Sequence, residues 1–443
     1  KWPSVLWLTL TVAVRQASPF SDSSQTAFSR CPASFSRPLP LLLRGRKSAG
    51  QHHSSLYLMT TEKSSAFLDA ADESLSAGKP PTKVLMIAGV TAAGKTDLSL
   101  DLAEALDGEL ISLDSVQIYK GADIGSGKIH PSQRRGLPHH LIDTFEPSER
   151  NVTAFDVCEM VRKEVLPGVL ARGKTPIFVG GTGLYTRMLL WGPSEAPGPD
   201  MALRSQLEDE ADEEGTTAMW DRLNAIDPLY AAKLSVNDRK RILRGLEICL
   251  SSNKRVSDFP FGATDTLIEE SRDDAPPPLA DEEWRRGFLV DQGTWDVRGW
   301  FLVRPRDVLR TRIAARLDGM LADGLVDEVK QLKNSGLEDN ISLSKAVGYR
   351  QVLAALAECK SPDGVLNGEE LTALRERIVT DTYRFAKRQL TWFRSKDEAC
   401  FRWIDMDKMG EQGALGVIVA DFRKARGERE TGDSYHASRF DYI

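Results

Sequence analysis

Short uninterrupted apolar runs in the first half of the chain alternate with stretches whose apolar residues recur at helical spacing. The runs are Val84–Ala88, Glu109–Leu113 and Thr175–Val179. Between them, helical spacing marks two stretches: Leu98, Leu102 and Leu106, and the segment 157–170. Apolar residues at successive positions are typical of strands buried on both faces of a parallel sheet, whereas a spacing of four marks the buried stripe of a helix. The alternation predicts an α/β fold with a doubly wound parallel sheet and helices on both faces.

The second half of the chain departs from this pattern and then returns to it. Residues 196–260 predict helices with charged faces, Trp300–Val303 is again an apolar run, and a helical stripe follows at Leu309, Ile313, Leu317 and Met320. We therefore expect an inserted helical domain. The predicted organisation is a possible targeting leader (1–58), a linker (59–82), the first part of the α/β core (83–195), the helical insert (196–260), an acidic insertion (261–297), core completion with a basic helical segment (298–405), and a tail (406–443).

The first apolar run ends in Gly89-Val-Thr-Ala-Ala-Gly94-Lys95-Thr96, which fits the G-x-x-x-x-G-K-[ST] phosphate-loop pattern between a strand and a helix. Backbone N–H groups of such a loop and of the helix that follows surround an anion. Lys95 adds a positive charge, and the Thr96 hydroxyl can bind Mg²⁺. The expected phosphate ligands are Gly89, Thr91, Ala92, Ala93, Gly94, Lys95 and Thr96. The pattern does not indicate which phosphate compound is bound.

Two further strand ends carry polar residues. The second run ends at Asp114, and the third ends in Gly180-Gly-Thr182-Gly. In parallel sheets ligands bind outside the carboxyl ends of the strands, so we expect these residues and the phosphate loop to face one crevice. Asp114 could cap the next turn, hold Mg²⁺ or accept a proton. Thr182 could cap a helix or hydrogen-bond to the substrate.

Composition describes an ordinary globular protein, with 443 residues, 41% hydrophobic and 28% charged. Its five cysteines are scattered and form no Cys/His metal spacing, which favours a reducing compartment without structural zinc. His139-His140 lacks a third ligand at metal spacing, so it indicates pocket structure. No apolar run reaches the roughly 18 residues of a membrane-spanning helix. The net charge of −6 argues at first against a nucleic-acid partner.

Residues 1–58 have the composition of a targeting leader. They hold seven basic residues and one acidic residue, with many serines and prolines, and Val5–Val14 has the length of a signal-peptide core. An organelle, either plastid or mitochondrion, is the expected location. The alternative is that upstream sequence has been wrongly joined, with a cytoplasmic start at Met59.

Charge is distributed very unevenly in the second half. Asp265–Glu283 contains eight acidic residues, one arginine and three prolines, and we expect an exposed, disordered insertion. Basic residues gather instead between Arg375 and Arg402, with aromatic residues among them: Tyr383, Trp392, Phe393 and Trp403. Composition alone favours a solvated helix with its aromatics in the core. The alternative is a surface on which unpaired bases stack.

Several motifs in order resemble one family. Besides GVTAAGKT, these are DSVQIYKGADIGSGK (114–128), GLPHHLID (136–143), GGTGLY (180–185), NDRKRILRGLE (237–247), AVGYRQ (346–351) and AKRQLTWFR (386–394). Together they cover about residues 82–405 and are similar to the tRNA dimethylallyltransferases, in the bacterial-like form of plants and algae. Val90, Ala93 and Ala122 depart mildly from the family's usual residues.

The resemblance implies a prenyl transfer to tRNA. N6 of the adenosine next to the anticodon (position 37) would attack C1 of dimethylallyl diphosphate, releasing pyrophosphate. Asp114 matches the family's general base, Thr182 a residue that hydrogen-bonds near the reacting centre, and Arg244 a cation for the leaving group, with Mg²⁺ as cofactor. The adenine would have to leave its stack. The implied partners are the tRNA anticodon stem-loop and dimethylallyl diphosphate, with no membrane, and we expect a monomer.

The matching motifs also imply a set of tRNA-binding residues: Asp114, Ser115, Val116, Gln117, Lys240, Arg241, Arg244, Lys345, Gly348, Tyr349, Arg350, Lys387, Arg388, Gln389, Trp392 and Arg394. Three rivals stay open. An adenylate isopentenyltransferase would share the phosphate loop and Asp114 but would not need the basic segment at 386–394. A small-molecule P-loop kinase would bind ATP, and a scaffold would bind a nucleotide without catalysis.

Overall fold

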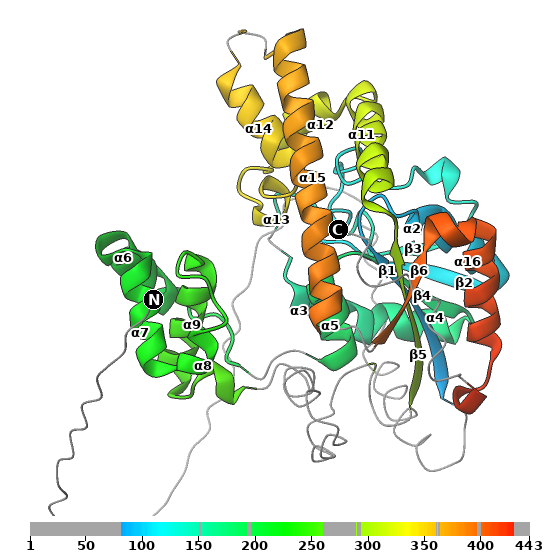
Figure 1. Ribbon diagram of the computed structural model, residues 1–443, viewed down its shortest axis with the longest axis horizontal. Helices are drawn as coiled ribbons and strands as arrows, with labels where there is room; N and C mark the ends of the chain where they lie inside the picture. The colour runs from blue at the N-terminus through cyan, green and yellow to red at the C-terminus, as the bar shows by residue number, and fades with distance from the viewer. Residues whose placement is uncertain are drawn as a thin grey trace, which may run out of the picture. The chain divides into compact units, whose positions relative to one another are not determined.

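Six parallel strands form the central sheet. The structure, a computed structural model, describes residues 81–149, 152–192, 196–259, 289, 294–359, 361, 364–396 and 400–428. The strand order is β3-β2-β4-β1-β5-β6 (Figure 1). Their bounds are β1 (Thr82–Gly89), β2 (Gly108–Leu113), β3 (His139–His140), β4 (Thr175–Gly180), β5 (Trp295–Val303) and β6 (Phe401–Asp405). The predicted leader, nearly all of the predicted linker and the acidic stretch 265–283 lie outside the described residues.

β1 is a central strand because its residues are apolar on both faces. Val84 and Leu85 are fully buried, and the strand pairs with β4 on one side and β5 on the other. The three predicted strands are confirmed as β1, β2 and β4, and the run Trp300–Val303 belongs to β5. The short β3 and β6 were not predicted, because two to five residues with charged or histidine side chains carry little apolar pattern.

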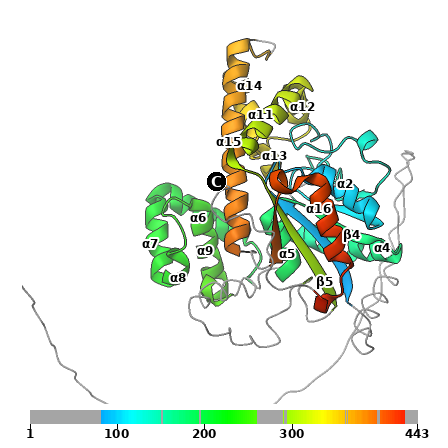
Figure 2. The ribbon, with the colours of Figure 1, turned by 45° about the vertical axis from the view of Figure 1, so that its right-hand side comes forward.

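Helices cover both faces of the sheet, as predicted. α2 (Lys95–Ala105) packs against β1, β2 and β4, and beside it α16 (Met406–Arg423) packs against β5 and β6. α3 (Ala154–Met160), the π-helical turn η3 (Val161–Val165), α4 (Leu166–Ala171) and α5 (Gly183–Trp191) lie on the other face (Figure 2). The connections β1-α2-β2 and β2-α3-β4 run in opposite directions along the sheet, so right-handed crossovers place their helices on opposite faces.

The prediction of a tail at 406–443 is wrong for the first half of this range. Residues 406–423 form α16, whose Ala414, Ile418 and Phe422 are buried against the sheet. Gly410, with φ 71°, breaks the helical geometry inside α16. This break and the glycines at 413 and 416 dilute the apolar stripe, which explains why the pattern did not reveal a core helix.

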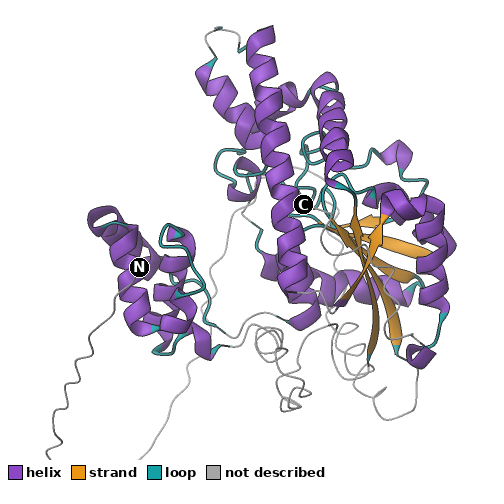
Figure 3. Cartoon of the chain, viewed as in Figure 1, coloured by secondary structure: helices purple, strands orange, loops and turns teal. Residues whose placement is uncertain are grey.

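Residues 200–258 form a helical bundle with a core of its own, as the predicted insert requires. Its helices are α6 (Met201–Glu214), α7 (Thr216–Ile226), α8 (Pro228–Ala231), α9 (Arg239–Ser252) and the 3₁₀ turn η4 (Val256–Asp258) (Figure 3). Leu207, Met219, Leu223 and Leu246 are fully buried within it. The side chains of Asp200, Asp227 and Asp238 accept hydrogen bonds at the starts of α6, α8 and α9, which fixes the helix boundaries.

A second helical layer follows β5. It comprises α11 (Arg306–Ala322), α12 (Leu325–Lys333), α13 (Ile341–Ser344), α14 (Tyr349–Glu358) and the long α15 (Gly368–Lys396). The predicted stripe on α11 is confirmed, since Leu309, Ile313 and Leu317 are buried. Short 3₁₀ turns are η2 (Pro131–Gln133) and η7 (Arg426–Glu428). Among the described helices, none is both long and apolar enough to cross a membrane.

Candidate active site

The phosphate loop turns sharply between β1 and α2. Gly94 has φ 102° and Ala92 has φ 62°, so two residues adopt left-handed backbone conformations within three positions. The Lys95 ammonium folds back over the loop and donates to the carbonyls of Gly89 and Val90, both at 2.9 Å. The loop lines a cavity of about 600 Å³ together with Thr96, Ser112, Asp114 and Gly181. The three predicted strand ends therefore face one crevice, as expected from the parallel sheet.

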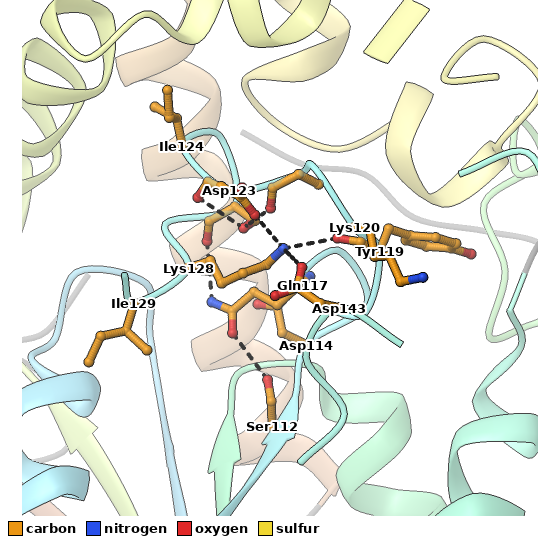
Figure 4. A network of polar contacts seen from close by, with 12 residues as sticks. Ser112, Asp114, Gln117, Tyr119, Lys120, Asp123, Ile124, Lys128, Ile129 and Asp143 are labelled. Atoms are coloured by element: carbon orange, nitrogen blue, oxygen red, sulfur yellow. Dashed lines mark hydrogen bonds and ion pairs between the residues drawn. The ribbon is translucent and has the colours of Figure 1, made fainter. Parts of the chain in front are cut away.

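Asp114 lies where β2 ends and performs the capping role that its position predicted. Its Oδ1 accepts hydrogen bonds from the backbone N–H groups of Val116 at 2.9 Å and Gln117 at 3.3 Å. Within the described part of the chain, its Oδ2 accepts no hydrogen bond. Gln117 is held in turn by Ser112, whose hydroxyl lies 3.1 Å from the Gln117 Oε1 (Figure 4). One carboxylate oxygen is thus fixed by the turn, and the other is available to a ligand in the cavity.

Lys95, Arg312 and Arg316 line the cavity with Asp114, and two of these cations interact with its charge. Burial and the nearby Arg316 charge lower the pKa of Lys95 to about 8, while Asp114 acts in the opposite direction. Desolvation within the cavity likewise lowers the pKa of Arg316, although the residue keeps contact with solvent, and Asp114 again opposes the shift. Arg316 Nη1 lies 3.4 Å from the Thr91 hydroxyl. Its guanidinium occupies the space beside Gly127, where a Cβ would come within 1.6 Å of Nη2. Positive charge is therefore concentrated where a phosphate would bind.

Arg304, directly after β5, and Arg312 of α11 also support the loop. Arg304 Nε donates to the carbonyl of Ala93 and Arg312 Nε to that of Ala92, both at 2.9 Å. Sequence reasoning missed Arg304, Arg312 and Arg316. The available signal was the helical spacing of Arg312 and Arg316, four residues apart at the edge of the buried stripe of α11. That signal alone does not distinguish a site from a solvated face.

Gln389 of α15 joins two edges of the cavity. Its Oε1 accepts from the Thr91 N–H at 2.8 Å, and its Nε2 donates to the Gly181 carbonyl at 3.0 Å. A Cβ on Gly181 would lie 2.3 Å from that nitrogen, so only glycine permits the approach. The side chain predicted to bind tRNA is 7% exposed and positions the phosphate loop against the end of β4.

Thr182 and Thr96 present hydroxyl groups at the site. Thr182 precedes α5, yet its side chain makes no capping hydrogen bond, so the capping alternative is not supported. It lines a second cavity of about 520 Å³, which shares Thr91, Asp114 and Arg316 with the first. Thr96 lines the first cavity. Among the described residues, no group of three or more His, Cys, Asp or Glu side chains could hold a metal ion by itself.

The second cavity brings together residues of all four segments predicted to bind tRNA, including Lys240 of α9. Its walls include Ser115 and Val116 after β2, Lys345, Gly348 and Arg350 before and within α14, and Arg388 of α15. Unlike these residues, Tyr349 has a fully buried side chain. Arg350 donates to Asp381 of α15 at 3.0 Å.

The aromatic residues of the basic segment serve mainly in packing. Tyr383 and Phe393 are buried, and the Phe393 ring lies 4.7 Å from that of Phe301. Trp392 packs against Gly183, where a Cβ would meet its indole at 2.3 Å. The core alternative therefore holds for Tyr383 and Phe393, whereas Trp392 is half-buried and its contact with tRNA stays a prediction. The cations lie outside them: Arg388 over Phe385, Arg394 over Trp403, and Lys387 over Tyr383, where Arg306 and Arg310 also lie.

Arg244 is engaged inside the helical bundle. Its Nη1 lies 2.9 Å from Glu247, and the guanidinium donates to the carbonyls of Pro197 and Gly198 in the connector before α6. Lys240 and Arg241 lie in the first turn of the same helix, and Arg241 pairs with Asp238. The role of Arg244 at the leaving pyrophosphate and the tRNA contacts of this stretch stay predictions.

Comparisons with known proteins agree with this geometry. A model of the IPP transferase family matches residues 117–396. A tRNA dimethylallyltransferase of Protochlamydia amoebophila is 35% identical over 350 residues, covering 78% of this chain and 90% of that protein. The tRNA dimethylallyltransferase of Geobacter sulfurreducens is 39% identical over 327 residues, covering 73% and 92%.

A solved structure of a eukaryotic dimethylallyltransferase, described as acting on tRNA, shares the fold. It has a TM-score of 0.60 and 23% identity, and the match covers 80% of this chain and 82% of that chain. The family model spans more than half of the chain, and the curated relatives are matched over most of their length. The chain therefore belongs to the IPP transferase family.

Proposed function

We propose that this protein transfers a dimethylallyl group from dimethylallyl diphosphate to N6 of the adenosine next to the anticodon of tRNA, releasing pyrophosphate. The observation that carries the proposal is the meeting of Asp114, Lys95 and Arg316 in one cavity. A carboxylate with one oxygen available, beside one cation of the phosphate loop and one of α11, suits attack by an amine on a carbon that carries a diphosphate.

The reaction breaks the bond between C1 of the donor and its bridging oxygen and forms a bond from N6 to C1. Negative charge grows on the departing diphosphate, where Lys95, Arg316 and the loop amides would stabilise it. The amine must lose a proton, and the Oδ2 of Asp114 would accept it. The Thr182 hydroxyl, which caps no helix, would orient a reactant at the shared edge of the two cavities. The products are prenylated adenosine and pyrophosphate.

Magnesium fits the donor set as a cofactor bound mainly through the substrate. Mg²⁺ is commonly held by one or two protein oxygens together with substrate phosphates and waters. The Thr96 hydroxyl lines the first cavity and would supply such an oxygen. When bound, the ion would neutralise charge on the diphosphate.

A large acceptor fits the second cavity better than a free nucleotide does. Its walls come from α14, α15 and the turn after β2, and they carry Lys345, Arg350 and Arg388. These are cations suited to RNA phosphates. We therefore favour the anticodon stem-loop of tRNA as the acceptor. We also propose that the enzyme is a monomer. For the location we favour an organelle, and fusing residues 1–58 to a fluorescent protein would test this.

A direct assay separates the rivals. The full chain is incubated with labelled dimethylallyl diphosphate, Mg²⁺ and either unmodified tRNA or AMP, and the nucleosides are then analysed by mass spectrometry. We expect prenylated adenosine only at the position beside the anticodon. Transfer to AMP alone would identify an adenylate isopentenyltransferase. Binding of ATP without binding of dimethylallyl diphosphate would favour a kinase.

A further inference from the structure

Glu328 on α12 makes an unusual set of hydrogen bonds for a residue outside both cavities. Its side chain is 8% exposed. Oε2 accepts from the backbone N–H of Asp123 at 2.9 Å and of Ile124 at 2.6 Å, and Oε1 accepts from that of Gly125 at 2.9 Å. Oε1 also accepts the Tyr349 hydroxyl at 2.8 Å. One carboxylate thus binds three successive amides and a phenol.

These three amides belong to the turn 123–128, which forms part of the wall of both cavities. Gly127 N–H donates to the Ile124 carbonyl, and Lys128 N–H to that of Asp123, both at 2.9 Å. Lys128 also pairs with Asp123 through its side chain (Figure 4). Ser126 and Gly127 line the first cavity, and Gly125 and Ser126 the second. The turn therefore contacts both the donor side and the acceptor side of the site.

The inner side of the turn contacts Gln117 and Arg316, which lie beside Asp114. The Gln117 amide nitrogen lies 3.4 Å from the Ser126 carbonyl, and the Gln117 N–H is bound by Asp114. Gly127 leaves the space that the Arg316 guanidinium fills. A displacement of the turn would therefore change the positions of both Asp114 and Arg316.

The outer side of the turn contacts Tyr349, which belongs to residues 345–350, the acceptor segment predicted to bind tRNA. Tyr349 is fully buried, its ring packs where a Cβ on Gly125 would lie 2.6 Å away, and burial together with Glu328 raises the pKa of its hydroxyl. The next residues attach to α15, since Arg350 and Gln351 both donate to Asp381. Gln351 also accepts from the Gly348 N–H at 2.8 Å.

We infer that Glu328 is a positioning residue for prenyl transfer. By fixing the amides of residues 123–125 and the Tyr349 hydroxyl at one point, it makes the cavity wall and the acceptor segment 345–350 a single unit. A carboxylate is required because all four partners donate hydrogen bonds, and an ionised carboxylate offers only acceptors. This inference rests on the proposed function, because positioning matters only if an amine must reach the donor carbon.

Glu328→Gln and Tyr349→Phe test the inference, with Glu109→Gln as a matched control. The amide introduced by Glu328→Gln presents N–H groups toward N–H donors, whereas Tyr349→Phe removes a single hydrogen bond. Glu109 is another buried carboxylate, 3% exposed, but it binds Arg172 and His140 at the opposite end of β2 from Asp114. Unfolding midpoints of all three variants are measured first, so that rates refer to folded protein.

In single-turnover assays at saturating tRNA, Glu328→Gln should slow transfer by about 10- to 100-fold, since a displacement of about 1 Å can cost about 100-fold. Tyr349→Phe should slow it several-fold. KM for dimethylallyl diphosphate should change less than about threefold, because Lys95 and the loop amides still bind the donor. Glu109→Gln should keep the wild-type rate. Equal rates for Glu328→Gln and Glu109→Gln, or a loss confined to KM, would overturn the inference.

Hydrogen exchange separates failure of the inference from failure of the proposed function. Amides 123–125 should exchange faster in Glu328→Gln and Tyr349→Phe than in the wild type, and should be unchanged in Glu109→Gln. If the wild type prenylates no tRNA, the proposed function fails whatever the exchange shows. If it does prenylate tRNA and these amides keep their protection in both variants, the inference alone is wrong. Tyr349→Phe decides the matter if Glu328→Gln does not fold.

Discussion

The cavity beside the phosphate loop and the interior of the helical bundle both bury charge, but they match it differently. In the bundle, Glu247 is 1% exposed and accepts from Arg204 at 2.6 Å, from Arg244 at 2.9 Å and from the Asp200 N–H at 2.7 Å. Its acceptors are satisfied by the protein itself. In the cavity, Asp114 uses one oxygen for its turn, and desolvation lowers the pKa values of Lys95 and Arg316.

The difference shows which charges maintain the fold and which await a ligand. Removing one partner of a buried, matched pair leaves an uncompensated charge, so it should reduce stability. The charged forms of cations that are desolvated and repel one another are unfavourable until an anion binds. Side chains with pKa values perturbed in this way are typical of functional sites. Substitutions in the cavity should therefore affect the rate, and substitutions in the bundle should affect stability.

Asp114→Asn should have the largest effect on the rate. Asparagine keeps an oxygen that can accept from Val116 and Gln117, so the turn persists, but the side chain can no longer accept a proton at neutral pH. General-base catalysis is worth about 10²- to 10⁴-fold, and we expect a fall of about 10³-fold in kcat for tRNA prenylation. The unfolding midpoint should stay near that of the wild type. If Asp114→Asn transfers the prenyl group at the wild-type rate, the Asp114 carboxylate is not the general base.

Arg316→Gln and Arg244→Gln form the second test, because they compare an arginine of the cavity with one of the bundle. Arg316→Gln should lower kcat by about 10²-fold through lost stabilisation of the departing diphosphate. Arg244→Gln should keep kcat per folded molecule but lower the unfolding midpoint, since it leaves Pro197, Gly198 and Glu247 with fewer donors. If Arg244→Gln slows transfer as much as Arg316→Gln, the role implied for Arg244 by the family motif would be supported, and the comparison would be wrong.

These two arginines also show what the sequence could predict. The phosphate loop, Asp114 and Thr182 were found because parallel strands place their carboxyl ends at one edge, and each residue follows a recognisable run. Arg316 lies in the middle of α11, more than 200 residues from the loop, and its approach depends on how α11 packs. Helical spacing predicts which face of α11 is buried but not which polar side chain meets the cavity. α16 was missed for a local reason, the glycines that interrupt its stripe.

Glu247→Gln should reduce stability without slowing the chemistry. The substitution replaces a buried carboxylate that accepts from three residues, and leaving buried donors unsatisfied costs about 1–3 kcal/mol. Because the bundle has its own core, its amides should lose exchange protection before those of the sheet. Glu210→Gln is the control, since its pair with Arg222 is on the surface of the same bundle and should contribute little. A fall in kcat with stability preserved would contradict this assignment.

The pH dependence of stability should give the smallest effect. Burial alone would raise the pKa of Glu247, but hydrogen bonds from Arg204, Arg244 and the Asp200 N–H outweigh it and lower the pKa below 4.5. A carboxylate with a lowered pKa in the folded state stabilises the fold above its unfolded pKa, and this contribution is lost as the pH falls through the folded value.

Urea unfolding of the wild type and Glu247→Gln at several pH values would measure this contribution. The difference in unfolding free energy should be constant from pH 7 to about 5.5 and should shrink only below about 4.5, because the substituted glutamine does not titrate while the other carboxylates titrate in both proteins. A difference that shrinks on the alkaline side would mean that Glu247 is protonated in the folded bundle. In that case its charge would not be matched by the two arginines, and the contrast with the cavity would be lost.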